Sequence, residues 1–236
     1  MRYSTNLNII IKAIEKATAR MSRDYIELEN LQSNVFSANK FVNSCYQRAK
    51  EVLFDDLSKI RPDYNIFFSD GQKIIRDEKA EYSYVIFPID GLENLSRANP
   101  DFTVAVALQH LNESGQTESI SLAVSKIFGG EIYYCEKGFG AYLNNRRIRV
   151  SKRSMSDSPL IETKKPSALN DKFLPRHYGC NTLALSYLAS CRLDGAIFES
   201  NALLKPFLLL VKEAGGKVEE SSDLFVASNG IIDLKI

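Results

Sequence analysis

Asp90 is the residue of this sequence with the clearest chemical potential, because it follows an apolar stretch and directly precedes Gly91. Residues 82–86 are rich in β-branched and aromatic side chains, which is typical of a buried strand, and Pro88 is expected to end the pairing of that strand. A turn at Asp-Gly followed by a helix would place a carboxylate beside free backbone N–H groups. This combination favours binding of a cation together with a phosphate. By pattern alone, Asp-Gly after an apolar run is most often only a hairpin turn.

The other nucleophiles, bases and metal ligands form no recognisable motif. Neither histidine, His110 or His177, accompanies a Ser or Cys nucleophile motif, so a catalytic triad is not indicated. The cysteines lie far apart, without a C-x-x-C pair or a neighbouring His, which argues against a zinc site and indicates free thiols in a reducing compartment. These cysteines are Cys45, Cys135, Cys180 and Cys191.

A run of basic residues lies near position 150. It contains Arg146, Arg147, Arg149, Lys152 and Arg153. Charged side chains on an edge strand protect a sheet from pairing with other chains, and this is the interpretation that we favour. Contact with an acidic partner or with RNA is the alternative.

The composition is that of an ordinary globular chain. Its 236 residues, 44% of them hydrophobic, are enough for one large domain or two closely packed halves. A formal net charge of +1 predicts no strong long-range attraction to a polyanion. Charged residues flank the only early apolar run, at 7–11, so we recognise no signal peptide and no membrane-spanning segment, and we expect a cytoplasmic protein.

Hydrophobic periodicity predicts two helices before the first strand. Apolar residues from Leu7 to Met21 recur at steps of three and four, which indicates one amphipathic helix, and a second helix is predicted over 39–59. Strands are predicted over 64–68, 102–108 and 119–128, and hairpins over 130–149 with turns at 137–138 and 144–145. The charged stretch 72–81 between them is expected to be a mobile loop.

The C-terminal part alternates between helix and strand signals. The stretch 151–170 is polar and contains two prolines, so we expect it to connect two halves of the protein. A helix is predicted within 179–192, with Cys191 on its apolar face, and a strand over 196–199. Pro206 suits the first turn of a last helix that ends at Ala214, before two glycines.

Four motifs spread along the chain resemble the inositol monophosphatase family, in its bacterial SuhB-like (extragenic suppressor) branch. They are P-I-D-G-L-E-N at 88–94, G-E-I-Y-Y-C-E-K-G-F-G-A-Y-L-N-N at 130–145, A-L-S-Y-L-A-S-C-R-L-D-G-A-I-F-E at 184–199 and K-E-A-G-G-K-V at 212–218. The resemblance implies an α/β (α+β) fold with layered αβαβα architecture. It also implies a single domain over 1–236, with an N-terminal α+β half at 1–150 and a C-terminal α/β half at 151–236.

The resembled proteins are phosphomonoesterases in which carboxylates hold Mg²⁺ ions that activate a water molecule. The resemblance assigns metal-ligand positions to Asp70, to the carbonyl of Ile89 and to Asp90. Asp70 stands where the family has a Glu and is one methylene shorter, so we expect Mg²⁺ to bind weakly or not at all. Whether the loop acids Asp77, Glu78 and Glu81 supply replacement ligands is left open by the sequence.

Other positions of the resembled site have lost their oxygen atoms. Phe87 stands at the first Asp of the family's D-P-I-D motif, and no rotamer of Phe can ligate a metal. The Asp of a later W-D motif corresponds to Leu203 or to Leu208, depending on the alignment. Leu92 replaces the Thr that would orient the attacking water, which removes a hydroxyl group from the catalytic position.

The resemblance also assigns substrate contacts to Gly91, Glu93 and Glu199. Glu93 is expected to lie at a helix start, where its carboxylate would meet the positive end of the macrodipole and exclude a substrate phosphate. A Glu93 turned to solvent is the alternative. Glu199 matches a contact to a substrate hydroxyl in the family, although an exposed acid at a strand end has the same pattern.

Three functional hypotheses follow from the resemblance. The first is a catalytically impaired or inactive phosphatase homologue. The second is an active Mg²⁺-dependent phosphatase of inositol 1-phosphate or another sugar phosphate, with a reduced metal site. The third is a SuhB-like protein that binds a transcription factor or RNA in transcription antitermination. Family members are commonly homodimers, so a homodimer is expected under each hypothesis.

Overall fold

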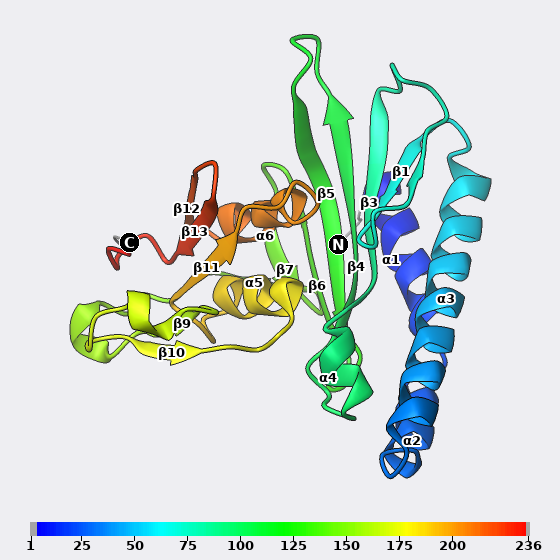
Figure 1. Cartoon of the computed structure of the whole chain (residues 1–236). Helices are drawn as coiled ribbons and strands as arrows, with labels where there is room; N and C mark the ends of the chain where they lie inside the picture. Colours follow the sequence, from blue (N-terminus) through cyan, green and yellow to red (C-terminus); the bar gives the residue numbers. More distant parts are fainter. Residues whose placement is uncertain (1–3, 235–236) are drawn as a thin grey trace.

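The computed structural model describes residues 4–234, which fold into two β-sheets and the helices that cover them. Helices α1 (Thr5–Thr18) and α3 (Val35–Ile60) lie on one side of the larger sheet (Figure 1). Helices α5 (Asn181–Ala189) and α6 (Leu209–Glu213) lie between the larger and the smaller sheet. The layers therefore follow the order helix, sheet, helix, sheet, and the expected layered α/β fold is confirmed.

Side-chain caps decide where the N-terminal helices begin. Ser4 Oγ accepts a hydrogen bond from the N–H of Leu7 at 3.1 Å, and Asn34 Oδ1 accepts one from the N–H of Ser37 at 3.1 Å. The second predicted helix therefore starts earlier than expected, directly after Asn34. The first predicted helix is wrong at its end, because the chain turns after Thr18 and a separate helix, α2 (Met21–Asn30), follows.

The larger sheet has the strand order β2-β1-β3-β4-β5-β6-β7-β8. These strands are β1 (Asn65–Phe68), β2 (Lys73–Ile74), β3 (Tyr82–Asp90), β4 (Thr103–Leu111), β5 (Thr117–Lys126), β6 (Glu131–Glu136), β7 (Gly140–Leu143) and β8 (Arg146–Ile148). Strands β1 and β3 run parallel, with Phe68 opposite Ile86, and the other neighbours are antiparallel. The parallel register brings the residues that follow β1 beside the end of β3.

The predicted hairpins between 130 and 149 are confirmed as β6, β7 and β8. Asn144 and Asn145 form the second turn with positive φ angles of 46° and 67°. Two consecutive residues of positive φ are typical of a type I′ turn, whose twist matches that of the flanking strands.

The smaller sheet has the order β10-β9-β11-β13-β12 and is formed by the C-terminal part of the chain. Its strands are β9 (Leu160–Glu162), β10 (Leu174–Arg176), β11 (Gly195–Glu199), β12 (Lys217–Glu220) and β13 (Leu224–Ser228). Three 3₁₀ helices lie in the same part of the described chain, namely η1 (Met155–Asp157), η2 (Pro166–Ala168) and η3 (Lys205–Leu208). The short helix α4 (Leu92–Ser96) follows the end of β3. The stretch 151–170 is therefore more than the expected connector. Its apolar piece forms β9, which pairs with β10 and β11.

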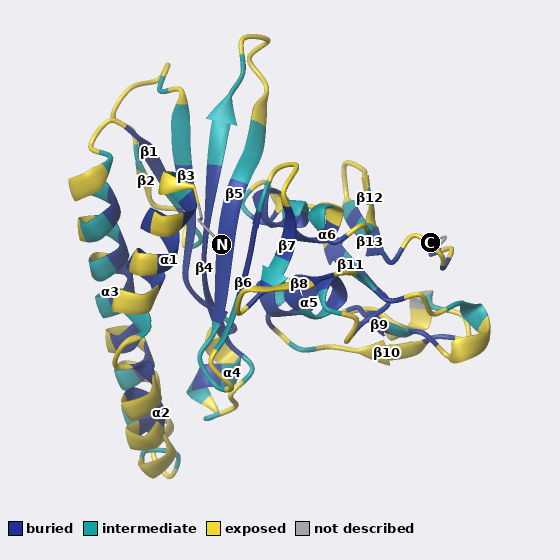
Figure 2. Cartoon of the chain, turned by 180° about the vertical axis from the view of Figure 1, so that it is seen from behind, coloured by how far each residue is buried: buried dark blue, intermediate teal, exposed yellow. Residues whose placement is uncertain are grey.

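Strand β3 is buried on both faces, as the dark centre of the sheet shows in Figure 2. Tyr84 and Ile86 pack into the core beneath α1 and α3. Val85 and Phe87 point to the opposite face and pack into the core around α5 and α6. Because side chains alternate along a strand, β3 contributes to the hydrophobic cores on both faces of the sheet. The residues available for chemistry therefore lie at the end of β3 and after it.

The ladder of β3 does not stop at Pro88, contrary to the sequence-based expectation. The strand continues to Asp90, which pairs with Thr103 after an irregularity between Phe87 and Asp90. A bulge accommodates a proline because a residue at a bulge need not donate to the ladder.

The stretch 72–81 is also not the mobile loop that its charge suggested. It contains β2, in which Ile74 pairs with Ile66 of β1. Asn65 ties down the residues that follow, because its Oδ1 accepts from the N–H of Arg76 at 2.7 Å and its Nδ2 donates to the carbonyl of Asp77 at 2.8 Å. One buried amide side chain therefore orders the segment.

The outer face of the smaller sheet lacks a long helix among the described residues. Apolar side chains on this face, including Ile161 and Ile197, pack against Met155, Phe173 and segments near the C-terminal end of the described chain. The expected fifth layer is therefore represented by irregular chain with the short helices η1 and η2. A three-residue 3₁₀ turn is enough to bring a few apolar side chains onto the sheet.

Cys191 is misplaced by the helical periodicity of 179–192. Helix α5 ends at Ala189, and Cys191 adopts a positive φ of 66° with an exposed side chain. The expectation that Cys191 packs on the apolar helix face is therefore wrong.

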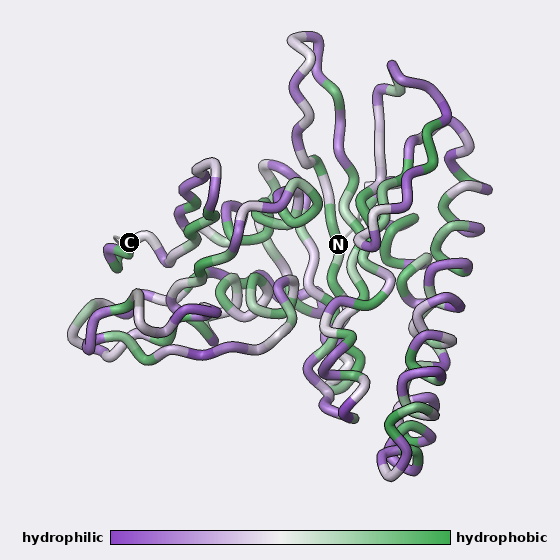
Figure 3. The backbone as a smooth tube through the Cα atoms, viewed as in Figure 1, coloured by the Kyte–Doolittle hydropathy of each residue, from purple (hydrophilic) through white to green (hydrophobic). Residues whose placement is uncertain are grey.

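Hydropathy varies along the strands of the larger sheet. The tip of the long β4–β5 hairpin is hydrophilic, and the strands become hydrophobic towards the middle of the sheet (Figure 3). Among residues 4–234, no helix combines the length and the apolar character needed to span a membrane.

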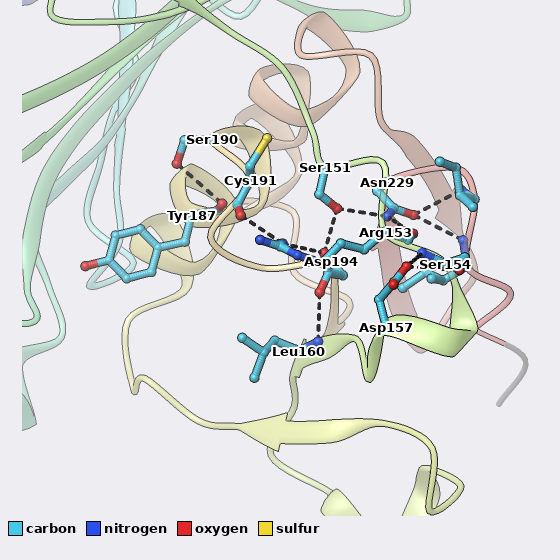
Figure 4. A network of polar contacts seen from close by, with 12 residues as sticks. Ser151, Arg153, Ser154, Asp157, Leu160, Tyr187, Ser190, Cys191, Asp194 and Asn229 are labelled. Carbon is cyan, nitrogen blue, oxygen red and sulfur yellow. Dashed lines mark hydrogen bonds and ion pairs between the residues drawn. The ribbon is translucent and has the colours of Figure 1, made fainter.

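Asp194 organises the junction between the smaller sheet and the chain that leads into it (Figure 4). Its side chain is 1% exposed. Oδ1 accepts from Ser151 Oγ at 2.6 Å and from Arg153 Nη1 at 3.0 Å, and Oδ2 accepts from the N–H of Leu160 at 2.9 Å. Asn229 extends the network by donating to Ser151 Oγ at 2.9 Å. The carboxylate thus joins segments on both sides of β9 and the end of β13.

We predict that Asp194→Ala lowers the free energy of unfolding by about 3 kcal/mol, because it leaves several buried donors without their acceptor. Urea unfolding followed by circular dichroism measures the change. Asp171→Ala, at an exposed position, is the control and should alter stability by less than about 0.5 kcal/mol. Equal stability of the two variants would contradict the structural role of Asp194.

Candidate functional site

Asp90 lies where β3 ends, and its carboxylate reaches the start of α5. Oδ2 accepts from the backbone N–H of Thr182 at 2.7 Å and from Thr182 Oγ1 at 2.8 Å. Because Thr182 is in the first turn of α5, Asp90 satisfies a free helical N–H and meets the positive end of the helix dipole. The carboxylate is thus held by the protein itself.

Gly91 allows the chain to turn sharply behind Asp90. Its φ is 86°, and a Cβ at this position would lie 3.0 Å from the carbonyl oxygen of Asp101 and 3.1 Å from Cys180 Cβ. Both the left-handed conformation and the close packing require glycine here. The predicted turn and the short helix α4 after it are therefore present.

A buried polar cluster surrounds the contact between Asp90 and α5. Thr103 Oγ1 lies 2.6 Å from Thr182 Oγ1, and Cys180 Sγ donates to the carbonyl of Asp90 at 3.4 Å. Burial, followed by the negative charge of Asp90, raises the pKa of the Cys180 thiol well above its ordinary value. Cys180 is therefore a protonated structural residue and not an activated nucleophile.

Asp70 follows β1 and already has a cationic partner, Lys50 of α3. Lys50 Nζ forms an ion pair with Asp70 Oδ2, and the N–H of Gln72 donates to Asp70 Oδ1 at 3.1 Å. Burial of Asp70 opposes ionisation, but the hydrogen bonds from Lys50 and Gln72 and the charge of Lys50 outweigh it and lower the pKa of this carboxyl. The carboxylate is therefore ionised at neutral pH, with both oxygens engaged.

Phe87 places an apolar ring on the face of β3 that packs against α5 and α6. Its exposure is 8%, and its ring meets that of Phe207 edge to face with the centroids 5.3 Å apart. Leu208 is buried in the same core, and Leu203 packs against it. Whichever leucine corresponds to the aspartate of the W-D motif, it belongs to a hydrophobic cluster and not to a polar site.

Leu92 and Glu93 form the first turn of α4 and face solvent. Leu92 is 37% exposed, so an apolar side chain lies at the position that the resemblance assigns to a Thr. The side chain of Glu93 is exposed and makes no hydrogen bond within the described residues, and α4 has no side-chain cap. Glu93 lies at the helix start as expected, but its side chain makes no hydrogen bond to α4, so the solvent-facing alternative describes it.

Glu199 ends β11 at the rim of a cavity of about 290 Å³. The cavity is also lined by Glu162, Lys164, Lys165 and Asn181. Glu162 is 2% exposed, and its carboxylate accepts from the N–H of Tyr178 at 3.0 Å and contacts His177 Nδ1 at 2.9 Å. Burial raises the pKa of Glu162, although His177 and the N–H of Tyr178 partly oppose the rise.

The loop acids do not approach this site. Asp77 is bound beside Asn65, at the start of β1, and Glu81 contacts His110 at the start of β3. At about 3.3 Å per residue, the two ends of β3 lie roughly 26 Å apart. The loop with Asp77, Glu78 and Glu81 therefore lies at the opposite end of β3 from Asp90, too far away to supply replacement ligands.

The donor set does not fit a Mg²⁺ cluster. Among residues 4–234, no group of three or more Asp, Glu, His or Cys side chains is arranged to hold a metal ion. The remaining candidates are Asp70, Asp90 and the carbonyl of the buried Ile89, and both carboxylates are engaged by protein donors. Since Mg²⁺ prefers six oxygen ligands, a metal here would compete with Lys50 and Gln72 for Asp70 and with Thr182 for Asp90 Oδ2.

The comparisons with known proteins agree with this architecture. The sequence pattern described as the inositol monophosphatase family matches residues 3–229. The chain belongs to the inositol monophosphatase family. The inositol-1-monophosphatase of Rhizobium meliloti is 30% identical to it over 233 residues, which cover 92% of this chain and 85% of that protein.

SuhB proteins of the same family are similar over a comparable length. The Nus factor SuhB of Vibrio cholerae is 28% identical over 234 residues, covering 91% of this chain and 84% of that protein. The crystal structure of the extragenic suppressor protein suhB from Bartonella henselae matches with a TM-score of 0.81 and 25% identity, covering 97% of this chain and 95% of that one. The family resemblance of the sequence motifs is therefore confirmed, and it extends over nearly the whole chain.

Three residues of the site were missed by sequence reasoning. They are Lys50, Thr182 and Glu162, and each is buried with a polar partner. A signal existed for Lys50, because it falls on the buried face of α3 between Tyr46 and Leu53 at helical spacing. A lone charge on such a face indicates an internal ion pair. Thr182 and Glu162 carry no comparable signal.

We predict that Thr182→Val destabilises the fold by about 1–2 kcal/mol, because it removes the hydroxyl donor to Asp90 while keeping the side-chain shape. Thermal and urea unfolding measure the loss. Thr117→Val, at an exposed strand start, serves as the matched control. A Thr182→Val protein as stable as the wild type would show that this hydroxyl does not anchor Asp90.

Proposed function

We propose that this protein is an inositol monophosphatase homologue whose phosphatase activity is strongly impaired or lost. One observation supports the proposal above others: each carboxylate that remains at a family ligand position is bound to a protein donor. Asp70 is paired with Lys50, and Asp90 accepts two hydrogen bonds from Thr182. The carboxylates that could ligate a catalytic metal therefore already bind groups of the protein.

The neighbouring substitutions remove the remaining chemical groups. Phe87 meets Phe207 edge to face at a position where the family has a carboxylate, and Leu92 supplies no hydroxyl to orient a water molecule. Loss of a single electrostatic group from an active site lowers turnover by about 10²- to 10³-fold. Several such losses together should leave little activity above background.

An active phosphatase with a reduced site is the competing proposal. It would use Asp70 and Asp90 with Mg²⁺, and its substrate, inositol 1-phosphate or another small phosphomonoester, would place its hydroxyls near Glu199 and the adjacent cavity. The metal would then compete with Lys50 for Asp70 and with Thr182 for Asp90 Oδ2. We place it second because nothing in the arrangement of Lys50 and Thr182 favours a metal ion over their contacts with the carboxylates.

Partner binding is a further candidate role, and exposed apolar side chains favour it. Val35 and Phe36, at the start of α3, are 62% and 78% exposed. They border adjacent surface hollows, with Gln32 and Arg97 beside Val35 and with Lys40 and Arg48 beside Phe36. Because a relative is named a Nus factor, we propose a transcription factor or RNA as the partner, in the cytoplasm, with the protein as a homodimer.

We predict that the purified protein, supplied with Mg²⁺ or Mn²⁺ and inositol 1-phosphate, releases phosphate no faster than an enzyme-free sample. Calorimetric titration of each metal, run alongside, should show no carboxylate-dependent binding. Asp90→Asn should leave these results unchanged. Metal-dependent release that Asp90→Asn abolishes would refute the proposal and restore the active phosphatase.

We predict that Phe36→Asp weakens recovery of a transcription factor or RNA in a pull-down from cytoplasm, because it puts a charge into the exposed apolar surface. Phe139→Asp, at an equally exposed aromatic residue on the β6–β7 turn, is the matched control. Recovery of neither class of partner by the wild-type protein would count against the partner-binding role.

A further inference from the structure

We propose that the outer edge of β8 is a docking site for an extended, acidic segment of a partner protein, which adds to the eight-stranded sheet as a further strand. This surface is distinct from the one around Val35 and Phe36, so the inference goes beyond the proposed function. The side chains that form it, which we call the basic edge, are Arg146, Arg147, Arg149 and Lys152.

The cations of the basic edge have no partners within the described part of the protein. All four residues are exposed. None of their side chains forms an ion pair or a hydrogen bond with any residue between 4 and 234. The positive charges of the segment 146–152 therefore remain available to an external ligand.

Carboxylates on the neighbouring segments are engaged elsewhere, so they do not neutralise the basic edge. Glu213 accepts from two backbone N–H groups at the β6–β7 turn, at 2.8 Å and 2.7 Å. Asp194 is paired with Arg153, and Glu131 is paired with Arg192. The local field at this edge of the sheet therefore stays positive, although the net charge of the whole chain is only +1.

The backbone of β8 is open on the side that faces away from β7. Strand β8 is the last of the sheet, and its Arg147 lies opposite Tyr142 of β7. In a two-residue hairpin, the residues that flank the turn exchange hydrogen bonds and the next pair does not. Arg147 therefore directs its own N–H and carbonyl outward, where an extended chain can bond to both.

The open stretch is short, because the chain beyond Ile148 is covered. Cys191 Sγ donates to the carbonyl of Arg149 at 2.9 Å, and the N–H of Val150 donates to the carbonyl of Ala214 at 3.1 Å. A partner strand thus gains few backbone hydrogen bonds here. Its affinity depends mainly on charge, which favours an acidic segment.

The hairpin also positions the charge of Arg147. A Cβ on Gly140 would lie 3.1 Å from both Nε and Nη2 of Arg147, so the guanidinium lies against the backbone of this glycine. Side chains on one face of an extended chain repeat every ~6.6 Å. Arg147 and Arg149 therefore match acidic side chains at alternate positions of a partner strand.

A protein segment fits this edge better than RNA does. Surfaces that bind single-stranded RNA present aromatic rings on which bases stack. The ring of Tyr142, the cross-strand neighbour of Arg147, is instead stacked on that of Tyr134, with the ring centroids 5.5 Å apart. The protection against aggregation that the sequence favoured is compatible with docking, since a basic edge repels basic strands and attracts acidic ones.

The test measures binding of a fluorescein-labelled peptide of alternating Glu and Thr residues by fluorescence polarisation. Arg146→Glu/Arg147→Glu should weaken binding by about tenfold, because two attractions become repulsions. Arg20→Glu/Arg23→Glu reverses two exposed arginines near the start of α2 and makes the same change in net charge, so it should bind as the wild type does.

Two modified peptides test strand pairing on the wild-type protein, without any substitution in it. N-methylation of the Glu residues and N-methylation of the Thr residues remove the N–H groups from opposite edges of an extended peptide. Only one of these edges can face Arg147, so the affinities of the two peptides should differ by about tenfold.

The inference is overturned if the unmodified peptide does not bind the wild type, if the two double variants bind it equally, or if the two methylated peptides bind alike. It is also overturned if a short single-stranded RNA binds more tightly than the peptide at physiological salt and loses this binding in Arg146→Glu/Arg147→Glu. The basic edge would then be a nucleic-acid surface. None of these readouts depends on phosphatase activity.

Discussion

The hydrogen bonds from Thr182 to Asp90 join the last residue of β3 to the first turn of α5, and the architecture of the site depends on them. Strand β3 carries both hydrophobic cores on its two faces, so its end is positioned rigidly. Helix α5 is packed between the two sheets, and its free N–H groups need an acceptor at that end. The Asp90 carboxylate meets this need, which connects the larger sheet to the helical layer beneath the smaller one.

A carboxylate that stabilises a helix in this way has less freedom for chemistry. Oδ2 of Asp90 accepts from two fixed donors, and a metal ion would compete with them for this oxygen. The same reasoning applies at Asp70, where Lys50 provides a full positive charge. Both acids retained from the family pattern thus serve the stability of the fold, and this use is compatible with an unaltered backbone.

The apolar replacements are consistent with that interpretation. Phe87 would be costly at the rim of a hydrated metal cluster, but it packs edge to face on Phe207 within a continuous hydrophobic core. The two rings form a favourable aromatic pair and exclude water from the space between β3 and η3. The core around α5 and α6 has in this way extended into the region that the resemblance assigns to catalysis.

The cavity beside Glu199 differs from the metal-ligand positions because most of the residues that line it are polar. Glu162 is buried against His177, while Lys164, Lys165 and Glu199 line the same space. Polar groups therefore persist on the side of the smaller sheet, although the metal-ligand positions on the larger sheet are apolar or paired.

The sequence by itself determined the family and the layered fold, and it showed which residue types stand at the positions that the resemblance assigns to catalysis. Motifs in the right order placed Asp90, Gly91 and Glu199, and the absence of oxygen from Phe87 and Leu92 is a matter of residue type. Local signals were less reliable where tertiary contacts intervened: Pro88 was accommodated by a bulge, and Asn65 ordered a charged segment that resembled a loop.

Only the tertiary structure decided what the retained carboxylates do. Lys50 and Asp70 are 20 residues apart in the sequence, and Asp90 and Thr182 are 92 residues apart. No local sequence pattern therefore connects these partners. Their pairing follows from the packing of α3 on one face of the sheet and of α5 on the other. Side-chain type can be read from sequence, whereas electrostatic compensation depends on which distant donors the fold brings within hydrogen-bonding distance.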